Sequence, residues 1–219
     1  MTTNTIRQIR PDLWETRTDS PFPGLTTHAY LWTPPGRNVM FYSPATDADF
    51  GAIDELGGVD DHYLSHQDEA GPMLARIADR YGARLHAGAA ELLTIGAHAH
   101  IDVAIGSRHV DSNGVEAIPT PGHTPGSVSY LVPGVHGETY LFVGDTTFVD
   151  GDGRWSTYVI PGMGDPVELA ASLQLLATLH PDIVISSAFT GAAAVHTVDG
   201  DRTWRDCVAE ALATVPVYR

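Results

Sequence analysis

The feature that most constrains the fold of this chain is the order of its strand-like and helix-like segments, because the same order occurs in both halves of the sequence. The first half opens with three segments rich in aromatic and β-branched residues, at 13–18, 27–34 and 38–44. A PPGR turn joins the last two as an antiparallel hairpin. Apolar residues at helical spacing then predict helices over 47–56 and 71–82, with a short buried strand over 61–66 between them.

The second half repeats this order. Strand-like segments come first, at 114–120, 127–133 and 139–145. They are followed by a helix over 165–180, a strand over 182–188 and a last amphipathic helix over 201–215. Two such halves predict two sheets packed face to face with helices outside, which is a four-layer αββα sandwich of the α/β (α+β) class.

Length and charge limit the classes of partner. No linker-like or low-complexity stretch divides the 219 residues, so we expect residues 1–219 to form a single domain. The 12 basic and 27 acidic residues give a formal charge of -15, which opposes binding to nucleic acid or anionic lipid. No segment approaches the roughly 18 to 20 apolar residues that span a bilayer, so we expect a cytoplasmic protein without a membrane partner.

Histidine is the main supply of ligands and bases in this sequence. There are 11 histidines but a single cysteine, Cys207, which can form no internal disulfide. In the segment PTPGHTPGS, at 119–127, His123 lies between two Pro-Gly pairs. Proline fixes its φ angle and glycine opens the positive-φ region, so we expect a rigid loop with His123 at its tip.

Two further segments place metal-type ligands at strand ends. His66 and Asp68 are two residues apart in an extended segment, so both side chains leave the same face before Pro72 begins a helix. Asp145 ends the apolar strand TYLFVGD, where Gly144 permits a close backbone approach. Because binding sites of layered α/β folds gather at strand ends, we expect these segments to meet the His123 loop.

Three motifs, in this order, resemble those of the metallo-beta-lactamase superfamily, of the glyoxalase II-like type. They are YLSHQDEAG at 63–71, TPGHTPGSVSYL at 120–131 and LFVGDTTF at 141–148. Together with the strand-rich start and the helical end, the resemblance covers essentially the whole chain. It implies the αββα sandwich and a metal-dependent hydrolase that acts on a small-molecule substrate.

The first motif departs from the family pattern, which reads His-x-His-x-Asp-His. If His66 is the first histidine, Asp68 replaces the second, and Ala70 and Gly71 stand where the aspartate and the last histidine belong. The strand entry YLSH favours this register. A second register, shifted by two residues, makes Glu69 the alternative ligand in place of the final histidine.

A further departure lies after the strand DIVISSA. Phe189 stands there at the position of the last histidine of the family. The resemblance therefore implies a reduced site in which the second metal position has lost most of its ligands, and we expect a mononuclear site.

The ligands that remain are His66, Asp68, His123 and Asp145. Two nitrogens and two carboxylates suit one divalent metal ion, with zinc favoured and iron or manganese possible alternatives. In this interpretation Asp68 and His123 are also catalytic, and a metal-bound hydroxide attacks an ester, thioester or lactone. The alternative is a non-catalytic or ligand-binding member of the fold with a vestigial metal site.

The segment HAHID has the spacing of the family motif at a different place. It contains His98, His100 and Asp102, but no strand precedes it and no glycine-bounded helix follows. We therefore expect an exposed edge strand or loop there. His196 lies at the wrong distance from the strand end to replace the missing histidine, and we expect it on the surface.

Two other residues are candidates for the surroundings of the site. The side chain of His28, in the predicted strand THAYLW, either faces the site or makes ordinary contacts within the sheet. We favour the second interpretation. Trp155 lies in the glycine-bearing insertion after Asp145, and we predict that it lines a lid.

Overall fold

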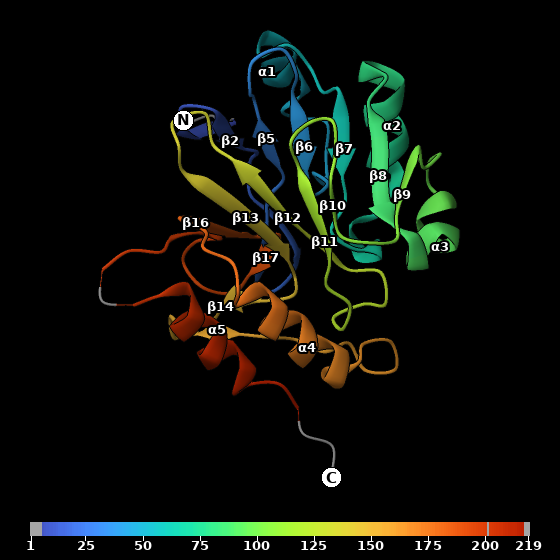
Figure 1. Cartoon of the computed structure of the whole chain (residues 1–219). Helices are drawn as coiled ribbons and strands as arrows, with labels where there is room; N and C mark the ends of the chain where they lie inside the picture. Colours follow the sequence, from blue (N-terminus) through green and yellow to red (C-terminus); the bar gives the residue numbers. More distant parts are fainter. Residues whose placement is uncertain (1–5, 201, 217–219) are drawn as a thin grey trace.

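Two large sheets face one another in the computed structural model, which describes residues 6–200 and 202–216 (Figure 1). The first sheet has the strand order β1-β2-β5-β6-β7-β8-β9. These strands are Arg7–Arg10, Leu13–Glu15, Tyr30–Trp32, Val39–Phe41, Asp61–Tyr63, Arg84–Gly88 and Val103–Ile105. Pairing is antiparallel from β1 to β6 and parallel from β6 to β9, so the expected hairpin between β5 and β6 is confirmed.

The second large sheet has the strand order β10-β11-β12-β13-β16-β18. Its strands are His109–Val110, Glu116–Pro119, Val128–Pro133, Thr139–Gly144, Ile183–Ser186 and Val195–Thr197. Only the β13–β16 pair in this sheet is parallel. Two small sheets complete the strands: β14 (Phe148–Val149) with β15 (Trp155–Ser156), and β17 (Ala188–Phe189) with β4 (Leu25–Thr27) and β3 (Asp19–Phe22).

Helices cover the outer face of each large sheet (Figure 1). Helices α1 (Phe50–Glu55), α2 (Pro72–Tyr81) and α3 (Leu92–Gly96) lie on the first sheet, with 3-10 turns η1 (Gln67–Glu69) and η2 (Ala89–Glu91) beside them. Helices α4 (Pro166–Leu176) and α5 (Trp204–Leu212) lie on the second sheet. The predicted αββα sandwich is confirmed. None of the described helices is long and apolar enough to cross a membrane.

The central core is aromatic. Phe41 of the first sheet stacks on Phe142 of the second with ring centroids 4.0 Å apart, and Tyr63 and Tyr130 pack around them. Alternation along each strand points these rings between the sheets, while Met40 and Leu141 point out under the helices. Each sheet is therefore buried on both faces, which fits the nearly continuous apolar strands of the sequence.

The helix boundaries follow from local chemistry. α2 begins at Pro72 and ends before Gly82, whose φ of 66° is left-handed, as the sequence predicts. The Asp165 carboxylate caps α4 by accepting the backbone N–H groups of Val167 and Glu168. The first helix is shorter than predicted: it spans Phe50–Glu55 rather than 47–56.

Two predicted features differ from the structure. The strand expected over 182–188 is split into β16 and β17, which belong to different sheets. The prediction that Trp155 lines a lid is wrong: its side chain is buried beneath α5, against the Trp204 ring at a centroid distance of 5.3 Å. A large apolar ring gains more free energy from burial under a helix than from facing an open cavity.

Candidate metal centre

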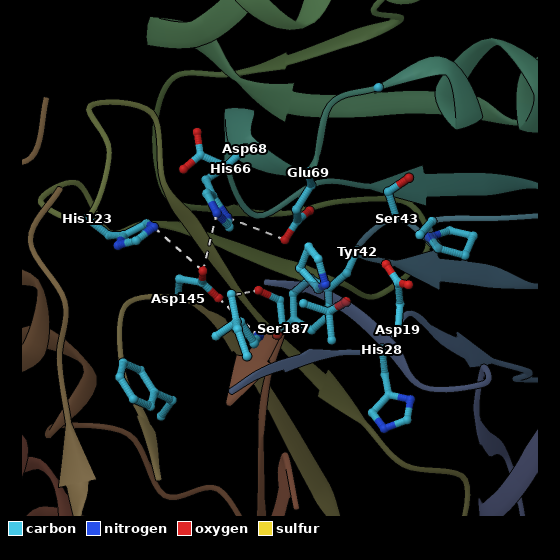
Figure 2. A pocket seen from close by; sticks show the side chains of 18 of the residues that line it. Asp19, His28, Tyr42, Ser43, His66, Asp68, Glu69, His123, Asp145 and Ser187 are labelled. Atoms are coloured by element: carbon cyan, nitrogen blue, oxygen red, sulfur yellow. Dashed lines mark hydrogen bonds and ion pairs between the residues drawn. The ribbon is translucent and has the colours of Figure 1, made fainter. Parts of the chain in front are cut away.

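The residues predicted as ligands come from three strand ends that meet at one edge of the sandwich. Strand β7 ends at Tyr63, and His66 and Asp68 follow within the next turn of chain. His123 lies in the loop between β11 and β12, and Asp145 follows β13 directly. Figure 2 shows the side chains of His66 and His123 converging on Asp145.

The distances among these side chains suit a single cation. One ligand atom each from His66, Asp68 and His123 form a set in which all atoms lie within 4.8 Å of one another. Asp145 Oδ2 lies 3.5 Å from His66 Nε2 and 3.6 Å from His123 Nε2. Both histidines are buried, whereas Asp68 is exposed.

The loop around His123 is held by a close contact with α4. Gly122 has a φ of 134°, and a Cβ atom there would lie 2.3 Å from the Leu169 backbone. His123 Nδ1 lies 2.8 Å from the Tyr158 carbonyl oxygen, which can only accept, so Nδ1 carries the proton. His123 Nε2 therefore carries no proton and presents a lone pair. It is buried without a hydrogen-bond partner among the described residues.

This unpartnered nitrogen is the observation that fits a metal. Buried polar atoms are nearly always hydrogen-bonded, and a histidine whose other ring nitrogen donates to a carbonyl is the usual form of a metal ligand. Burial, followed by the positive charge of His66, lowers the pKa of His123, so the neutral form that binds a cation is favoured.

His66 is oriented by a hydrogen-bonded chain. The Ser65 hydroxyl donates to Glu69, and Ser65 Oγ therefore accepts from His66 Nδ1 at 2.8 Å, which leaves Nε2 toward Asp145. Burial lowers the pKa of His66, but Asp145, Glu69 and Asp68 together outweigh it and the pKa rises to about 9. The site therefore attracts positive charge at Nε2.

Asp145 has one oxygen held and one oxygen free for the histidines. Oδ1 accepts from the Ser187 hydroxyl and from the Ala188 backbone N–H at 3.1 Å. Burial raises the pKa of Asp145, but the charges of His66 and His123 and these hydrogen bonds outweigh it, so the net shift is downward. The carboxylate is ionised and Oδ2 faces the two histidines.

The two ligand-bearing strand ends touch at Gly144. A Cβ atom there would lie 2.3 Å from Ser65 Oγ, so a larger residue would push Asp145 and His66 apart. The Gly144 N–H donates to the hydroxyl of Tyr42, which in turn donates to the Ile185 carbonyl. Tyr42 is the one described non-glycine residue with positive φ, at 65°, which marks local strain beside the site.

Glu69, the alternative ligand of the shifted register, is engaged elsewhere. Its Oε2 accepts the Ser65 backbone N–H at 2.9 Å and its Oε1 accepts the Ser65 hydroxyl. Both oxygens therefore serve to hold Ser65 and, through it, His66.

The other histidines weighed from sequence lie outside the cluster. His98 and His100 follow α3, and the His100 side chain is 87% exposed, 3.9 Å from Asp102. His196 lies partly buried on β18, where its Nε2 is bonded to the Ala193 carbonyl. The second histidine motif is thus a loop, as expected.

His28 lies beside the centre rather than in it. It lines the same cavity, its ring is stacked on Phe189 at 5.7 Å, and its Nδ1 lies 2.7 Å from the Thr16 carbonyl. Phe189, which sequence analysis places at the position of the family's last histidine, is buried against the His28 ring.

Sequence reasoning missed the residues that hold the ligands. Ser65 precedes His66 directly, so its position alone was a usable signal. Ser187 and Tyr158 had no such signal, because they reach Asp145 and His123 from 42 and 35 residues away.

A cavity of about 690 Å³ opens over the centre, within the range of small-molecule sites. It lies between the His66 and His123 side on one wall and the Asp19 and His28 side on the other (Figure 2). A sandwich with a group of side chains that could hold a metal ion at its strand ends, and a cavity above them, makes this a candidate metal centre open to small molecules.

The chain belongs to the metallo-beta-lactamase superfamily, whose family model matches residues 50–188. It is 33% identical over 163 residues to a hydroxyacylglutathione hydrolase of Acidiphilium cryptum, covering 71% of this chain and 62% of that one. It is 29% identical over 169 residues to a hydroxyacylglutathione hydrolase of Dechloromonas aromatica, covering 73% and 57%. The chain thus spans less than two thirds of the length of these curated relatives.

Solved structures share the fold at low sequence identity. A metallo-beta-lactamase from Pontibacter korlensis superposes with a TM-score of 0.72 at 14% identity, covering 96% of this chain and 97% of that one. One from Cronobacter sakazakii, described by its HARLDQ motif, gives a TM-score of 0.65 at 18% identity and covers 84% and 77%. These likenesses establish the architecture alone.

Proposed function

We propose that this protein is a metal-dependent hydrolase that cleaves an ester, thioester or lactone at a mononuclear centre. His66, Asp68, His123 and Asp145 would hold the ion. The observation that carries the proposal is the buried Nε2 of His123, which has a fixed tautomer and no partner in the described part of the chain. The names of the curated relatives, which are hydrolases of a glutathione thioester, support the reaction class.

A single ion is proposed because the positions for a second one lack donors. Ala70, Gly71 and Phe189 offer no nitrogen or oxygen on their side chains. The donor set of two imidazoles and two carboxylates suits zinc, and iron(II) or manganese would accept it with water in open positions.

A divalent cation at this centre would supply Lewis acidity and lower the pKa of water to about 7. The chain's own groups fix the geometry: Tyr158 holds His123, Ser65 and Glu69 hold His66, and Ser187 holds Asp145. Asp68, the exposed member, lines the cavity and would accept the proton of the attacking water. The water oxygen bonds to the carbonyl carbon, the C–O or C–S bond breaks, and the proton passes to the leaving group.

Elemental analysis and a substrate panel test this proposal. Protein expressed with zinc, iron or manganese should retain about one equivalent of metal per chain after dialysis. It should also hydrolyse at least one class in a panel of esters, thioesters and lactones, with a rate that rises through neutral pH. Two retained equivalents would contradict the mononuclear site. No retained metal under any of these conditions would favour the vestigial-site alternative.

A further inference from the structure

The cavity over the candidate metal centre combines apolar walls with an excess of negative charge. Leu25, Pro44, Met73, Phe148 and Ile160 supply apolar surface. Four carboxylates also line it, from Asp19, Asp68, Glu69 and Asp145. One divalent cation would neutralise only half of that negative charge.

No arginine or lysine among residues 6–200 and 202–216 offsets these carboxylates, and His66 and His123 would be neutral as metal ligands. The whole sequence contains no lysine, and no described arginine lines the cavity. Ten arginines instead form ion pairs with acidic side chains elsewhere. An anionic substrate would therefore meet no complementary charge except the metal itself.

Asp19 is the carboxylate that would act on the part of the substrate remote from the metal. It lies across the cavity from His123, on the side that Ser43 and His28 also line (Figure 2). Glu69 and Asp145 are held by internal hydrogen bonds, whereas the Asp19 carboxylate has no hydrogen bond or ion pair to any described residue. It is partly buried, so its charge is less screened than that of an exposed acid.

We infer that this site selects neutral or cationic substrates with an apolar group and rejects anionic ones. This inference rests on the proposed hydrolase function and specifies its substrate class. It sets the chain apart from relatives named for glutathione thioesters, because glutathione carries carboxylates that this cavity would repel. Asp19 is the proposed charge-selecting residue.

The test uses three butyryl thioesters that differ mainly in charge. The thiols are N-acetylcysteamine, which is neutral, thiocholine, which is cationic, and mercaptopropionate, which is anionic. With metal-loaded protein at low salt, kcat/KM should be at least about tenfold higher for the neutral and cationic esters than for the anionic one. The ratio should shrink at high salt, where the Debye length is shorter.

Asp19→Asn should narrow the ratio of neutral to anionic kcat/KM by about threefold, as expected for one partly screened charge. Asp79→Asn is the matched control, because Asp79 is exposed on α2 and does not line the cavity. It removes the same charge from the protein and should leave the ratio unchanged. An equal effect of both variants would overturn the role of Asp19.

A binding measurement separates the two proposals. The same three thiols carrying an uncleavable S-butyl group are titrated into the metal-loaded protein by calorimetry. If no thioester is cleaved, the proposed function fails for thioesters, and the charge selectivity is decided by binding alone: tighter binding of the neutral and cationic thioethers supports it. If the anionic compound is cleaved or bound as well as the neutral one, the selectivity is overturned while the hydrolase stands.

Discussion

Strand β7 has a group of histidine and carboxylate side chains at each end, and the two groups differ in what their polar atoms contact. The entry cluster, at the start of the strand, consists of Asp61, His62 and His86. The exit cluster, beyond its end, consists of His66, Asp68, His123 and Asp145.

The Asp61 carboxylate of the entry cluster is saturated by hydrogen-bond donors. Asp61 Oδ1 accepts from His86 Nε2 at 2.7 Å and from Arg84 at 3.0 and 2.8 Å, and Oδ2 accepts from Arg37 at 3.1 Å. His62 Nε2 is bonded to the Tyr42 carbonyl at 2.8 Å. Such a cluster ties strands together and offers the Asp61 carboxylate no capacity for a ligand.

In the exit cluster, the atoms that have hydrogen-bond partners are those turned away from the centre. Tyr158, Ser65 and Ser187 hold the far atoms of His123, His66 and Asp145, while the near atoms face one another and the cavity. The comparison teaches that burial alone does not mark a histidine as a candidate ligand. What marks His123 is a ring nitrogen whose lone pair has no partner among the described residues and lies beside a cavity.

The largest expected effect is loss of the metal from the exit cluster. His123→Ala should lower metal affinity and turnover by more than about 100-fold, because residues that merely support a ligand already cost up to that much. Circular dichroism should show a folded protein. Metal content by elemental analysis is the measurement, with exposed His100→Ala as the control. A His123→Ala variant that retains the metal of the parent would break the comparison.

The next effect is a pH dependence that belongs to the entry cluster. Burial lowers the pKa of His62 to about 4, from 6.5 in the unfolded chain. As the pH falls, the unfolded chain therefore takes up the proton first. The free energy of unfolding keeps its full value above pH 6.5 and decreases by about 3 kcal/mol as the pH falls toward about 4. Urea unfolding across this interval should show a shallower loss for His62→Gln than for the parent. Parallel curves would refute this assignment.

Asp61→Asn should destabilise the fold without affecting metal. The variant loses the charge that Arg37 and Arg84 bind, and we expect a cost of about 2 kcal/mol, since hydrogen bonds to charged groups contribute about 1.5 to 3. The cost is not larger because the Arg84 and Arg37 side chains are 48% and 43% exposed and can be solvated. Asp145→Asn is its mirror image, with metal lost and the fold retained. Thermal unfolding and metal content measured on both variants would expose any exchange of these roles.

The smallest effect concerns a residue that only positions a ligand. Ser187→Ala removes one of the two donors to Asp145 Oδ1 and should weaken metal affinity about tenfold. Ser107→Ala, at an exposed serine, is the control. An unchanged metal Kd would show that the Ala188 N–H alone suffices to orient the carboxylate.

The fold and the segments that bear the proposed ligands could be predicted from the sequence, because both depend on local patterns. Alternating and helical apolar patterns predicted the two sheets and the α2 and α4 helices, because side-chain periodicity is set by backbone geometry. His66 with Asp68, His123 and Asp145 were predicted from their immediate neighbours in the chain, namely the strand ends and the Pro-Gly turns. Their roles as ligands stay a proposal.

What the sequence by itself determined was which residues stand at strand ends and on rigid loops, because propensity, turn chemistry and spacing act over a few residues. Only the tertiary structure decided which hydrogen-bond partners each histidine meets. No role was assigned from the sequence to the buried His62 and His86, and Trp155 was predicted in a lid although the residue packs under α5. Hydrogen-bond partners such as Ser187 for Asp145 and Tyr158 for His123 are brought together by the packing of distant segments, and no local pattern encodes that meeting.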